Sequence, residues 1–346
     1  MTMTDSTFLI AGTTHKKNGM WSGLRACLRG VPLFIVVGIF MFFTILIYSD
    51  RLKWESAEDK LQQLANTVIE QGQSIDNLQR TLTDRVNIFS RNAPTIFAIT
   101  PTFTRPVQKA ELTRVAQTFL HVPNFHWIVI EDSITKSELV SNFLQESGLV
   151  YKHLNIVTPP NFKLGKNDPN WKKPRGVAQR NEALKWLRQN FNSSHNGVVY
   201  FADDDNTYSL KLFKEMAKIK VVGVWPVGLV GGLMVERPIC DPATMKVTGF
   251  NAAWKPERKF PLDMAGFAIS LRVVLEKKDA WFSFESKNGY QETEILEQMV
   301  TRDQLEPLAD CCTKVYVWHT RTEPPTLKDE NRLNRKGKKS NVDIEV

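Results

Sequence analysis

The chain has 346 residues, of which 42% are apolar and 24% charged, and a formal net charge of +8. A chain of this length buries a core of ordinary size in one large domain or two smaller ones. The positive charge could indicate nucleic acid, but no basic run with interleaved aromatic residues is present, so no nucleic-acid partner is expected. A basic surplus also suits anionic substrates such as sugar nucleotides or acidic glycans. The 4 cysteines do not make a disulfide framework.

Residues 31–48 form an unbroken apolar stretch without a charged residue. As a helix this stretch is about 27 Å long, close to the hydrocarbon thickness of a bilayer. It is long for a cleaved signal peptide, begins late and has no small-x-small cleavage site after it. We therefore expect a single-pass signal anchor that follows a cytosolic tail at residues 1–30.

The orientation of this anchor is predicted from the basic residues beside it. They stand on both sides, so the positive-inside rule favours a cytosolic N-terminus only by a small margin. The sequon at Asn192 fits a luminal C-terminal portion, where Asn-x-Ser/Thr can accept a glycan. The flanking basic residues are Lys16, Lys17, Arg25 and Arg29 before the stretch and Arg51, Lys53 and Lys60 after it.

Residues 49–92 carry a second pattern, in which apolar residues recur at alternating steps of three and four. That spacing is the a/d seam of a coiled coil, with one polar position at Gln71 and a helix-weakening glycine at Gly72. A single amphipathic helix that packs on the following domain is the alternative. Beside a membrane anchor we favour a parallel stem that makes the protein a homodimer and ends at Asn92-Ala93-Pro94. The apolar seam residues are Trp54, Ala57, Leu61, Leu64, Val68, Ile75, Leu78 and Leu82.

From Thr95 onward strand-like and helix-like periods alternate. This alternation predicts an α/β fold with a largely parallel sheet. Residues after Val221 are typical of strands joined by glycine turns, and residues 329–346 of a polar, basic, mobile tail. We expect strands at 95–100, 126–132 and 153–157, helices at 107–120 and 175–188, and a central strand that begins at Gly197.

The central strand runs directly into three carboxylates, Asp203, Asp204 and Asp205, and Ser209 then caps a helix at 210–218. At the carboxyl edge of a parallel sheet such side chains offer hard oxygen ligands where α/β folds bind their ligands. Because adjacent carboxylates repel one another, keeping three together at a buried strand end indicates a cation. On spacing alone, an acidic solvated turn is an equally good interpretation.

The cysteines divide around the apolar stretch, with Cys27 before it and Cys240, Cys311 and Cys312 after it. A bridge from Cys240 to one of the two adjacent cysteines can be drawn, but free thiols are the favoured prediction. The count alone fixes no pairing.

Several stretches around these carboxylates resemble the Golgi β-1,3-glucuronosyltransferases, type II membrane enzymes that move glucuronic acid from UDP-glucuronate to a terminal galactose. The resemblance covers residues 95 to 325 nearly without a gap. It implies the two-subdomain GT-A nucleotide-sugar transferase fold for a luminal catalytic domain at 93–346, Mn²⁺ dependence and inversion at the anomeric carbon. The stretches are PTFTRPVQKAEL (101–112), PRGVAQRNEAL (174–184), VVYFADDDNTYS (198–209), VWPVGLVGGL (224–233), FPLDMAGFA (260–268) and VWHTRTE (317–323).

The resemblance assigns the donor side of a site. Asp205 would bind Mn²⁺ directly, Asp204 would hydrogen-bond the ribose, and Asp203 would orient its neighbours. Asp132, at the end of a predicted strand, would bind the uracil. Phe103 stands where the family usually has a tyrosine that stacks on the uracil, so the ring face remains and the hydroxyl is absent.

Four basic residues complete the donor side in this resemblance. Arg175 and Arg180, at a predicted helix start, would contact the nucleotide and the glucuronate carboxylate, as guanidinium groups suit such anions. His319 and Arg321 alternate along an extended stretch, so they point the same way. They match the pair that contacts the diphosphate.

The acceptor side and the base are assigned in the same way. Glu236, Arg258 and Asp263 match positions that bind acceptor sugars, and Trp254 could stack on a sugar ring, although core packing is the better interpretation of that tryptophan alone. Glu292 matches the general base that deprotonates the galactose 3-hydroxyl. The ordinary explanation of an acidic residue at a helix start is its favourable interaction with the helix dipole. Glu294, two residues further on, cannot face the same way as Glu292.

We therefore expect a Golgi membrane enzyme that adds glucuronate to galactose by one in-line displacement. The leading acceptor is the galactosyl-galactosyl-xylose linker on proteoglycan core proteins. The alternative acceptor is N-acetyllactosamine on glycoproteins. A different class remains open, a catalytically weak homologue that serves as a lectin or a stem-dimerised scaffold.

Overall fold

The computed structural model describes residues 33–88, 93–165, 168–169, 172–323 and 325–342, and it divides the chain into two compact units between Thr83 and Asp84. The predicted cytosolic tail, the first residues of the anchor and the last residues of the stem lie outside the described ranges. Every described strand belongs to the second unit.

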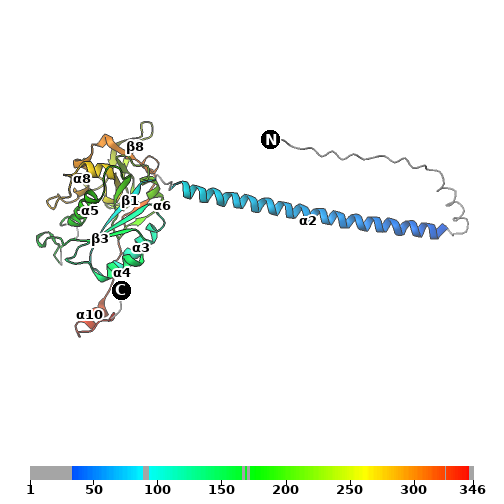
Figure 1. Cartoon of the computed structure of the whole chain (residues 1–346), viewed down its shortest axis with the longest axis horizontal. Coiled ribbons are helices and arrows are strands. Elements are labelled where there is room, and N and C mark those ends of the chain that lie inside the picture. The colour runs from blue at the N-terminus through cyan, green and yellow to red at the C-terminus, as the bar shows by residue number, and fades with distance from the viewer. Residues whose placement is uncertain (1–32, 89–92, 166–167, 170–171, 324, 343–346) are drawn as a thin grey trace. The chain divides into compact units, whose positions relative to one another are not determined.

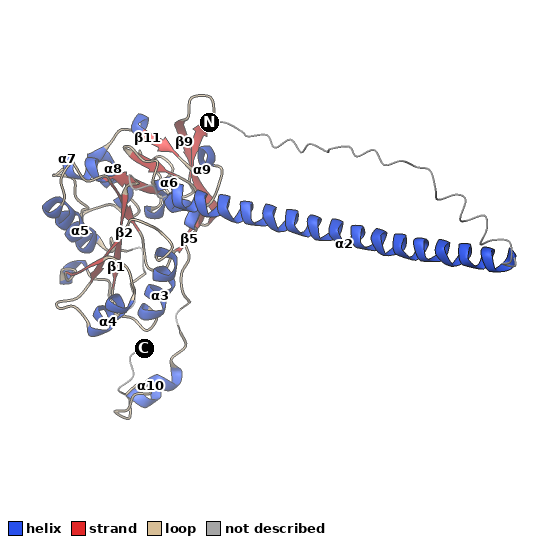
Figure 2. Cartoon of the chain, turned by 45° about the vertical axis from the view of Figure 1, so that its right-hand side comes forward, coloured by secondary structure: helices blue, strands red, loops and turns tan. Residues whose placement is uncertain are grey.

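Helix α2 (Leu33–Ile88) is one continuous helix of 56 residues that contains most of the predicted anchor and stem (Figure 2). Within its segment Leu33–Leu78, a window of 18 residues has a mean hydropathy of 2.2, so the helix is long and apolar enough to cross a membrane, by length and composition. The stem side chains of Leu61 and Leu64 are 66% and 62% exposed, so the a/d seam is open along this part of the helix. A continuous helix is what the stem requires, and its pairing stays a prediction.

The second unit is built on a seven-stranded sheet with the order β11-β6-β10-β4-β1-β2-β3 (Figure 1). The expected α/β architecture is confirmed. Strands β1 to β4 pair in parallel as predicted, whereas β10 pairs antiparallel with both β4 and β6. The strands are β1 (Thr95–Thr102), β2 (Phe125–Glu131), β3 (Tyr151–Asn155), β4 (Gly197–Phe201), β6 (Val222–Val224), β10 (Phe267–Ser270) and β11 (Leu305–Pro307).

Helices cover both faces of this sheet, because strand side chains alternate between two apolar clusters. On one face Trp127 and Tyr200 pack with α3, α4 and α6. On the other face Ile128 and Val199 pack with α5, α7 and α8. This alternation fixes the register, and so it decides which strand ends lie side by side. The helices are α3 (Gln108–Phe119), α4 (Glu138–Glu146), α5 (Val177–Asn190), α6 (Leu210–Met216), α7 (Leu271–Glu276) and α8 (Gln291–Met299).

Two of these helices begin close to the predicted residues at the carboxyl edge of the sheet. Ser209 caps α6, and its hydroxyl accepts a hydrogen bond from the backbone N–H of Lys211. Helix α5 begins after Gly176, whose φ of 70° lies in the left-handed region that favours glycine. A Cβ at this position would lie 2.7 Å from Nη1 of Arg180, so the glycine leaves room for that side chain.

A smaller five-stranded sheet has the order β5-β12-β7-β8-β9. The β7–β8 turn contains Gly231 and Gly232 at φ of 62° and 79°, which confirms the predicted glycine turn between strands. Strand β12 pairs with both β5 and β7. This pairing brings the residues after 316 beside the loop that contains Asp203, Asp204 and Asp205, which we call the acidic triplet. The strands are β5 (Thr207–Tyr208), β7 (Val227–Val230), β8 (Leu233–Asp241), β9 (Lys246–Asn251) and β12 (Val317–Trp318).

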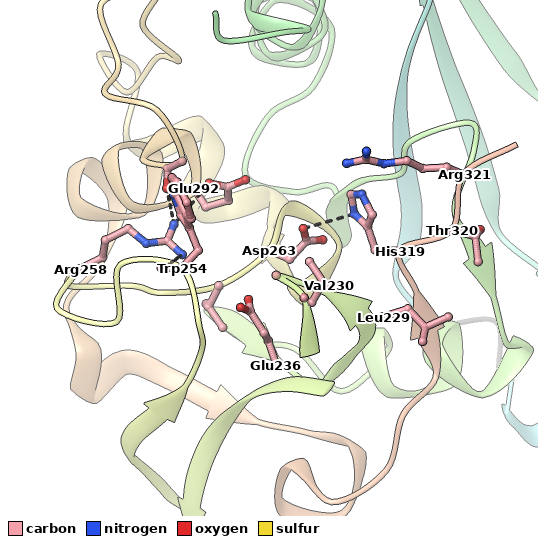
Figure 3. A pocket seen from close by; sticks show the side chains of 14 residues that line it. Leu229, Val230, Glu236, Trp254, Arg258, Asp263, Glu292, His319, Thr320 and Arg321 are labelled. Carbon is pink, nitrogen blue, oxygen red and sulfur yellow. Dashed lines mark hydrogen bonds and ion pairs between the residues drawn. The ribbon is translucent and has the colours of Figure 1, made fainter. Parts of the chain in front are cut away.

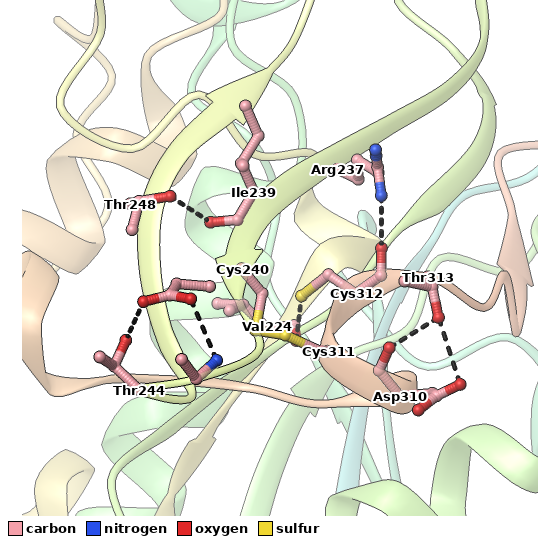
Figure 4. The surroundings of a disulfide bond; sticks show 12 residues. Val224, Arg237, Ile239, Cys240, Thr244, Thr248, Asp310, Cys311, Cys312 and Thr313 are labelled. Carbon is pink, nitrogen blue, oxygen red and sulfur yellow. Dashed lines mark hydrogen bonds between the residues drawn. A yellow bond between two sulfur atoms is a disulfide. The ribbon is translucent and has the colours of Figure 1, made fainter.

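A disulfide joins Cys240 of β8 to Cys311 of α9 (Ala309–Cys312), so the prediction of free thiols was wrong for these two residues (Figure 4). Cys312, also among the described residues, is a buried free thiol. The left-handed backbone of Asp310 and Cys311 turns the chain so that the two bridged Cα atoms lie 5.4 Å apart. No local sequence pattern predicts such a turn, because it needs positive φ at residues that rarely adopt it.

The C-terminal segment contains helix α10 (Lys328–Asn334), where an irregular tail was expected. Asp329 and Glu330 stand in its first turn and Arg332 in its last, where their charges suit the helix dipole. The Glu330 carboxylate also accepts a hydrogen bond from the backbone N–H of Ser340 at 3.2 Å. These local contacts explain why a polar segment adopts a helix here.

Candidate active site

Strand β4 ends at Phe201, and the acidic triplet follows it. The first two carboxylates of the triplet are paired with arginines. Oδ1 of Asp203 accepts a hydrogen bond from Nη2 of Arg180 at 2.8 Å. Asp204 is 6% exposed, and its Oδ2 accepts a hydrogen bond from the Thr102 hydroxyl at 2.8 Å. Its Oδ1 lies 2.7 Å from Nη2 of Arg105. Both carboxylates therefore have fixed orientations.

Asp205, the third carboxylate, accepts no hydrogen bond on its side chain from the residues that the structure describes. Burial, and after it the charges of the two preceding aspartates, raise the pKa of this carboxyl to about 6, against the opposing effect of His319. Its backbone is fixed, because its carbonyl oxygen accepts hydrogen bonds from Arg114 at 2.9 Å and Thr320 at 2.6 Å. An open carboxylate crowded by like charges is a site that a cation stabilises.

A hard divalent cation fits this donor set, since carboxylate oxygens are the ligands that such ions prefer. Within the described ranges, no group of three or more His, Cys, Asp or Glu side chains could by itself hold a metal ion. The chain would therefore supply Asp205 and leave the other positions to a ligand such as a diphosphate.

The two predicted arginines at the start of α5 have different environments. Arg180 is 6% exposed and donates to the Arg175 carbonyl oxygen at 2.8 Å as well as to the triplet. Its Nε is buried without a hydrogen-bond partner among the described atoms. Arg175 itself is exposed. One arginine thus orients the triplet, and the other is accessible to an anion from solvent.

The two predicted uracil contacts lie at adjacent strand ends. Phe103 follows β1 and is 51% exposed. Asp132 follows β2 and accepts hydrogen bonds from the backbone N–H and the hydroxyl of Thr158 at 2.7 and 2.8 Å. Because β1 and β2 pair in parallel with Thr102 opposite Glu131, these side chains reach the same sheet edge.

A pocket of about 670 Å³ lies beside the smaller sheet (Figure 3). It is lined by the β7–β8 glycine turn, the segment after β12 and the residues that precede and begin α8. The predicted donor residues Phe103, Asp132, Arg175, Arg180 and 203–205 do not line it. The predicted site residues that line it are Glu236, Trp254, Arg258, Asp263, Glu292, His319 and Arg321.

Glu292 lies in the first turn of α8, on the wall of this pocket. Burial, and after it the charge of Asp263, raise the pKa of its carboxyl to about 7. Nη1 of Arg258 lies 3.7 Å from its Oε2 and opposes this shift. A carboxyl that titrates near neutral pH beside a pocket can take a proton from a substrate hydroxyl. Glu294 does not line the pocket, which agrees with the prediction that it faces another way.

His319 and Asp263 form an ion pair across the pocket floor, with Nδ1 of the histidine 3.4 Å from Oδ2 of the aspartate (Figure 3). The Asp263 carboxylate raises the pKa of His319, although burial opposes it. Arg321 lines the same pocket as His319 (Figure 3). Together they place cationic groups at one end of the pocket.

The other end of the pocket carries buried polar groups beside an open aromatic ring. Glu236 is 5% exposed, and its Oε1 accepts a hydrogen bond from the backbone N–H of Ala253 at 3.0 Å. Arg258, also 5% exposed, donates to the carbonyl oxygens of Trp254 at 3.3 Å and of Gly289. Trp254 is 50% exposed. This end therefore offers an apolar face next to hydrogen-bonding groups.

Sequence reasoning missed several residues that shape the site. Thr320 directly follows His319, and its hydroxyl donates a hydrogen bond to the Asp205 carbonyl oxygen at 2.6 Å. Because side chains of an extended stretch alternate, a contact of Thr320 with another element could have been predicted. A Cβ at Gly231 would lie 2.0 Å from Oε1 of Glu236, so this glycine does more than make a turn. No local sequence pattern indicated Arg105, because its partner Asp204 is far away in the sequence and its partner Glu111 lies on the next helix.

Asn192 lies on the exposed loop between α5 and β4, away from these groups in the sequence. Its Oδ1 accepts hydrogen bonds from the backbone N–H of Ser194 at 3.0 Å and from its hydroxyl at 2.6 Å. The sequon is therefore accessible from solvent, and its glycosylation stays a prediction.

The model of glycosyltransferase family 43 matches residues 115–323. The chain is 56% identical over 257 residues to galactosylgalactosylxylosylprotein 3-beta-glucuronosyltransferase I of Drosophila melanogaster, covering 73% of this chain and 84% of the relative. It is 52% identical over 247 residues to the human protein galactosylgalactosylxylosylprotein 3-beta-glucuronosyltransferase 1, covering 70% and 74%. Among solved structures it is similar to S. aureus TarS 1-349, at 18% identity with a TM-score of 0.42 over 65% of this chain and 60% of that one. The family match and the identities over most of the chain show that this chain belongs to glycosyltransferase family 43.

Proposed function

We propose that this protein transfers glucuronate from UDP-glucuronate to the 3-hydroxyl of the terminal galactose in the galactosyl-galactosyl-xylose linker of proteoglycan core proteins. The names of the Drosophila and human relatives support this acceptor and do not favour N-acetyllactosamine. The single structural observation that carries the proposal is Glu292, a carboxyl with a pKa of about 7 on the wall of the pocket.

In the proposed reaction Glu292 is the general base. A sugar hydroxyl is a poor nucleophile at neutral pH, so the attacking oxygen needs a base within hydrogen-bond reach. Deprotonated Glu292 would take that proton at a carboxylate oxygen, and Arg258 at 3.7 Å stabilises its charged form. A single displacement with inversion needs this one base and no nucleophile from the chain. Glu236 and Trp254 would then hold the acceptor sugar at the open end of the pocket.

Mn²⁺ is the proposed cofactor, and Asp205 is the residue that would hold it. Bound beside a diphosphate, a divalent metal neutralises the charge that develops on the leaving group. Arg180 fixes Asp203 next to this position, while Arg114 and Thr320 fix the Asp205 backbone. His319 and Arg321 add positive charge where the diphosphate would lie.

The nucleoside would be held at the strand ends of the larger sheet. Phe103 offers an exposed ring face on which uracil can stack, and Asp132 a carboxylate that can accept from its N–H. Asp204 is in place to accept from a ribose hydroxyl, because each carboxylate oxygen has a second lone pair beyond the bonds it already makes.

Purified protein with UDP-glucuronate and Mn²⁺, offered the linker trisaccharide or N-acetyllactosamine in parallel, tests this function. We expect kcat/KM for the linker to exceed that for N-acetyllactosamine by about tenfold or more, equivalent to roughly 1.4 kcal/mol in the transition state. The reverse preference would reassign the acceptor. Binding of either glycan without any transfer would support the lectin or scaffold class instead.

The proposed location is the Golgi membrane, with α2 as a type II anchor and the catalytic unit in the lumen. The apolar part of α2 supports the anchor, and the exposed sequon at Asn192 is compatible with a luminal domain. In sealed microsomes the second unit should resist added protease until detergent is present. Asn192→Gln should remove one glycan, seen as a mobility shift that glycosidase treatment of the parent reproduces.

The proposed assembly is a homodimer joined through the stem. The open seam on α2 supports this, because exposed leucines at a/d positions are stabilised by a second copy of the same helix. Leu61→Lys with Leu78→Lys should weaken the stem by placing charges in the seam. Sedimentation of a peptide of residues 49–92 decides the stem's contribution, and a monomer at high micromolar concentration refutes it.

A further inference from the structure

Arg105 lies between two buried carboxylates and an aromatic ring, in the loop that joins β1 to α3. Its Nη2 contacts Glu111 of α3 and lies 2.7 Å from Oδ1 of Asp204. Its guanidinium carbon lies 4.6 Å from the centre of the Phe103 ring, and Nη1 donates to the Phe103 carbonyl oxygen at 3.1 Å. One side chain therefore contacts both the ring and the carboxylate that the proposed function gives to the nucleoside.

The two carboxylates depend on this arginine, because both are removed from water. Glu111 is 4% and Asp204 6% exposed, whereas the Arg105 side chain keeps 15%. Two buried carboxylates beside one guanidinium repel each other, and the shared cation is what makes their proximity tolerable. A planar guanidinium can contact both of them and the ring at once, which a compact ammonium group cannot.

The rest of the cluster leaves Asp204 only one orientation. Its second oxygen accepts from the Thr102 hydroxyl at 2.8 Å, and that hydroxyl in turn accepts from Nε2 of Gln108 at 3.1 Å. Thr102 and Gln108 are 3% and 2% exposed, so neither side chain can move without disturbing the packing. Arg105, more exposed than these groups, connects this fixed core to the half-exposed Phe103 ring.

We propose that Arg105 is a positioning residue for the nucleoside half of the donor: it supports one face of the Phe103 ring, leaves the other face for the base, and fixes the Asp204 carboxylate for the ribose. The inference rests on the proposed use of a uridine nucleotide. It concerns ground-state binding of the nucleoside, so it predicts an effect on donor affinity that is separate from the acceptor and from the chemical step.

Arg105→Lys in the full-length protein is the primary variant, because it keeps the charge and removes the planar fork. We expect the KM for UDP-glucuronate and the Kd for UDP to rise about tenfold, equivalent to 1.4 kcal/mol. The inhibition constants of UDP and UMP should rise by the same factor, because both carry the nucleoside. The KM for the acceptor and kcat should stay within about threefold, as for a loss of uniform binding.

A rescue variant separates positioning from general structure. In Arg105→Lys with Glu111→Gln, only one carboxylate remains for the lysine, so part of the lost UDP affinity should return. Glu111→Gln alone leaves Arg105 with Asp204 and should change the donor KM by less than about threefold. Arg272→Lys, in an exposed pair with Glu276, is the matched control and should change neither constant.

The outcomes of this experiment are distinguishable from failure of the proposed function. If the parent binds UDP but transfers nothing to the linker trisaccharide, the acceptor assignment fails and the UDP affinities of the variants still decide the role of Arg105. An unchanged UDP affinity in Arg105→Lys overturns the inference. So does an equal rise in donor and acceptor KM, or the absence of any rescue by Glu111→Gln. A parent that binds no UDP overturns both proposals.

Discussion

The acidic triplet and the pocket both present carboxylates, but they hold them in opposite ways. At the triplet, Asp203 and Asp204 are each paired with an arginine at 2.7 to 2.8 Å. On the pocket wall, Glu292 has its nearest cation at 3.7 Å, and burial raises its pKa to about 7. The paired carboxylates are held in one geometry by their arginines, whereas a buried and loosely paired one can exchange a proton near neutral pH.

This difference separates binding from chemistry in a physical way. A group that must recognise the same ligand each time benefits from saturated hydrogen bonds, because these remove its freedom before the ligand arrives. A base must be able to accept a proton, so it cannot be held by strong donors on every oxygen. Asp205 stands between the two cases, since its backbone is fixed and its carboxylate is open.

Glu292→Gln should give the largest effect on activity, because it removes the carboxylate that we propose as the general base while keeping the size and hydrogen bonding of the side chain. General-base catalysis contributes about 10²–10⁴-fold, so kcat should fall by that order. UDP affinity should stay close to that of the parent, since Glu292 is not among the nucleoside contacts. Glu294→Gln is the matched control on the same helix and should be nearly silent. More than about a tenth of parental kcat in Glu292→Gln would remove it from the role of base.

Asp205→Asn tests the open member of the triplet. Losing the carboxylate that we propose as the metal ligand should lower activity by about 10²-fold, because the metal would supply several kcal/mol of charge stabilisation on the leaving group. The variant should remain folded, as removing one of three repelling charges does not disturb the Arg180 and Arg105 pairs. Activity against Mn²⁺ concentration, with EDTA as the blank, is the measurement. Parental activity in excess EDTA would contradict metal dependence.

Much of this arrangement could be predicted from sequence, because period and turn chemistry are local signals. The parallel strands, the Ser209 cap and the triplet at the end of β4 all follow from residues within a few positions of one another. The alternation of His319 and Arg321 likewise predicted a shared direction, and both residues line the pocket.

The pairings between distant residues could not be predicted in this way. Arg105 meets Asp204 only because β1 and β4 are neighbours in the sheet, and no local pattern contains that register. The antiparallel pairing of β10 and the left-handed turn that brings Cys311 to Cys240 likewise have no local sequence pattern. They depend on how distant segments pack, which overrides local preference.

The pH profile sharpens the contrast between paired and loosely paired carboxylates. Glu292 must be deprotonated to act as the base, so kcat/KM should rise with pH and level off above the pKa of about 7. Below that value it should fall about tenfold per pH unit. The affinity for UDP should be less affected between pH 6 and 7 at saturating Mn²⁺. A flat kcat/KM from about pH 5.5 to 8 would contradict the assignment.

Removing the disulfide should give the smallest effect on activity, and we expect that effect in the pocket and not at the acidic triplet. Cys240 ends the same strand that carries Glu236, and its bridge to Cys311 closes a loop with a sequence separation of 71. A bridge over a loop of that length stabilises the folded chain by about 4 kcal/mol, chiefly by restricting the unfolded state. Cys240→Ala with Cys311→Ala should therefore lower the free energy of unfolding by up to that amount, measured by denaturant titration.

Its effect on catalysis should be selective, because β8 carries Glu236 to the end of the pocket that we propose for the acceptor, and not to the acidic triplet. The acceptor KM should rise by about threefold, the donor KM should not change, and a reductant should affect the parent but not the double variant. Cys312→Ala is the matched control: it removes the neighbouring buried thiol, leaves the bridge intact and should cost only about 1 kcal/mol as a small cavity. If a reductant lowered the stability of the double variant as much as that of the parent, the bridge would not be the element that holds β8 in place.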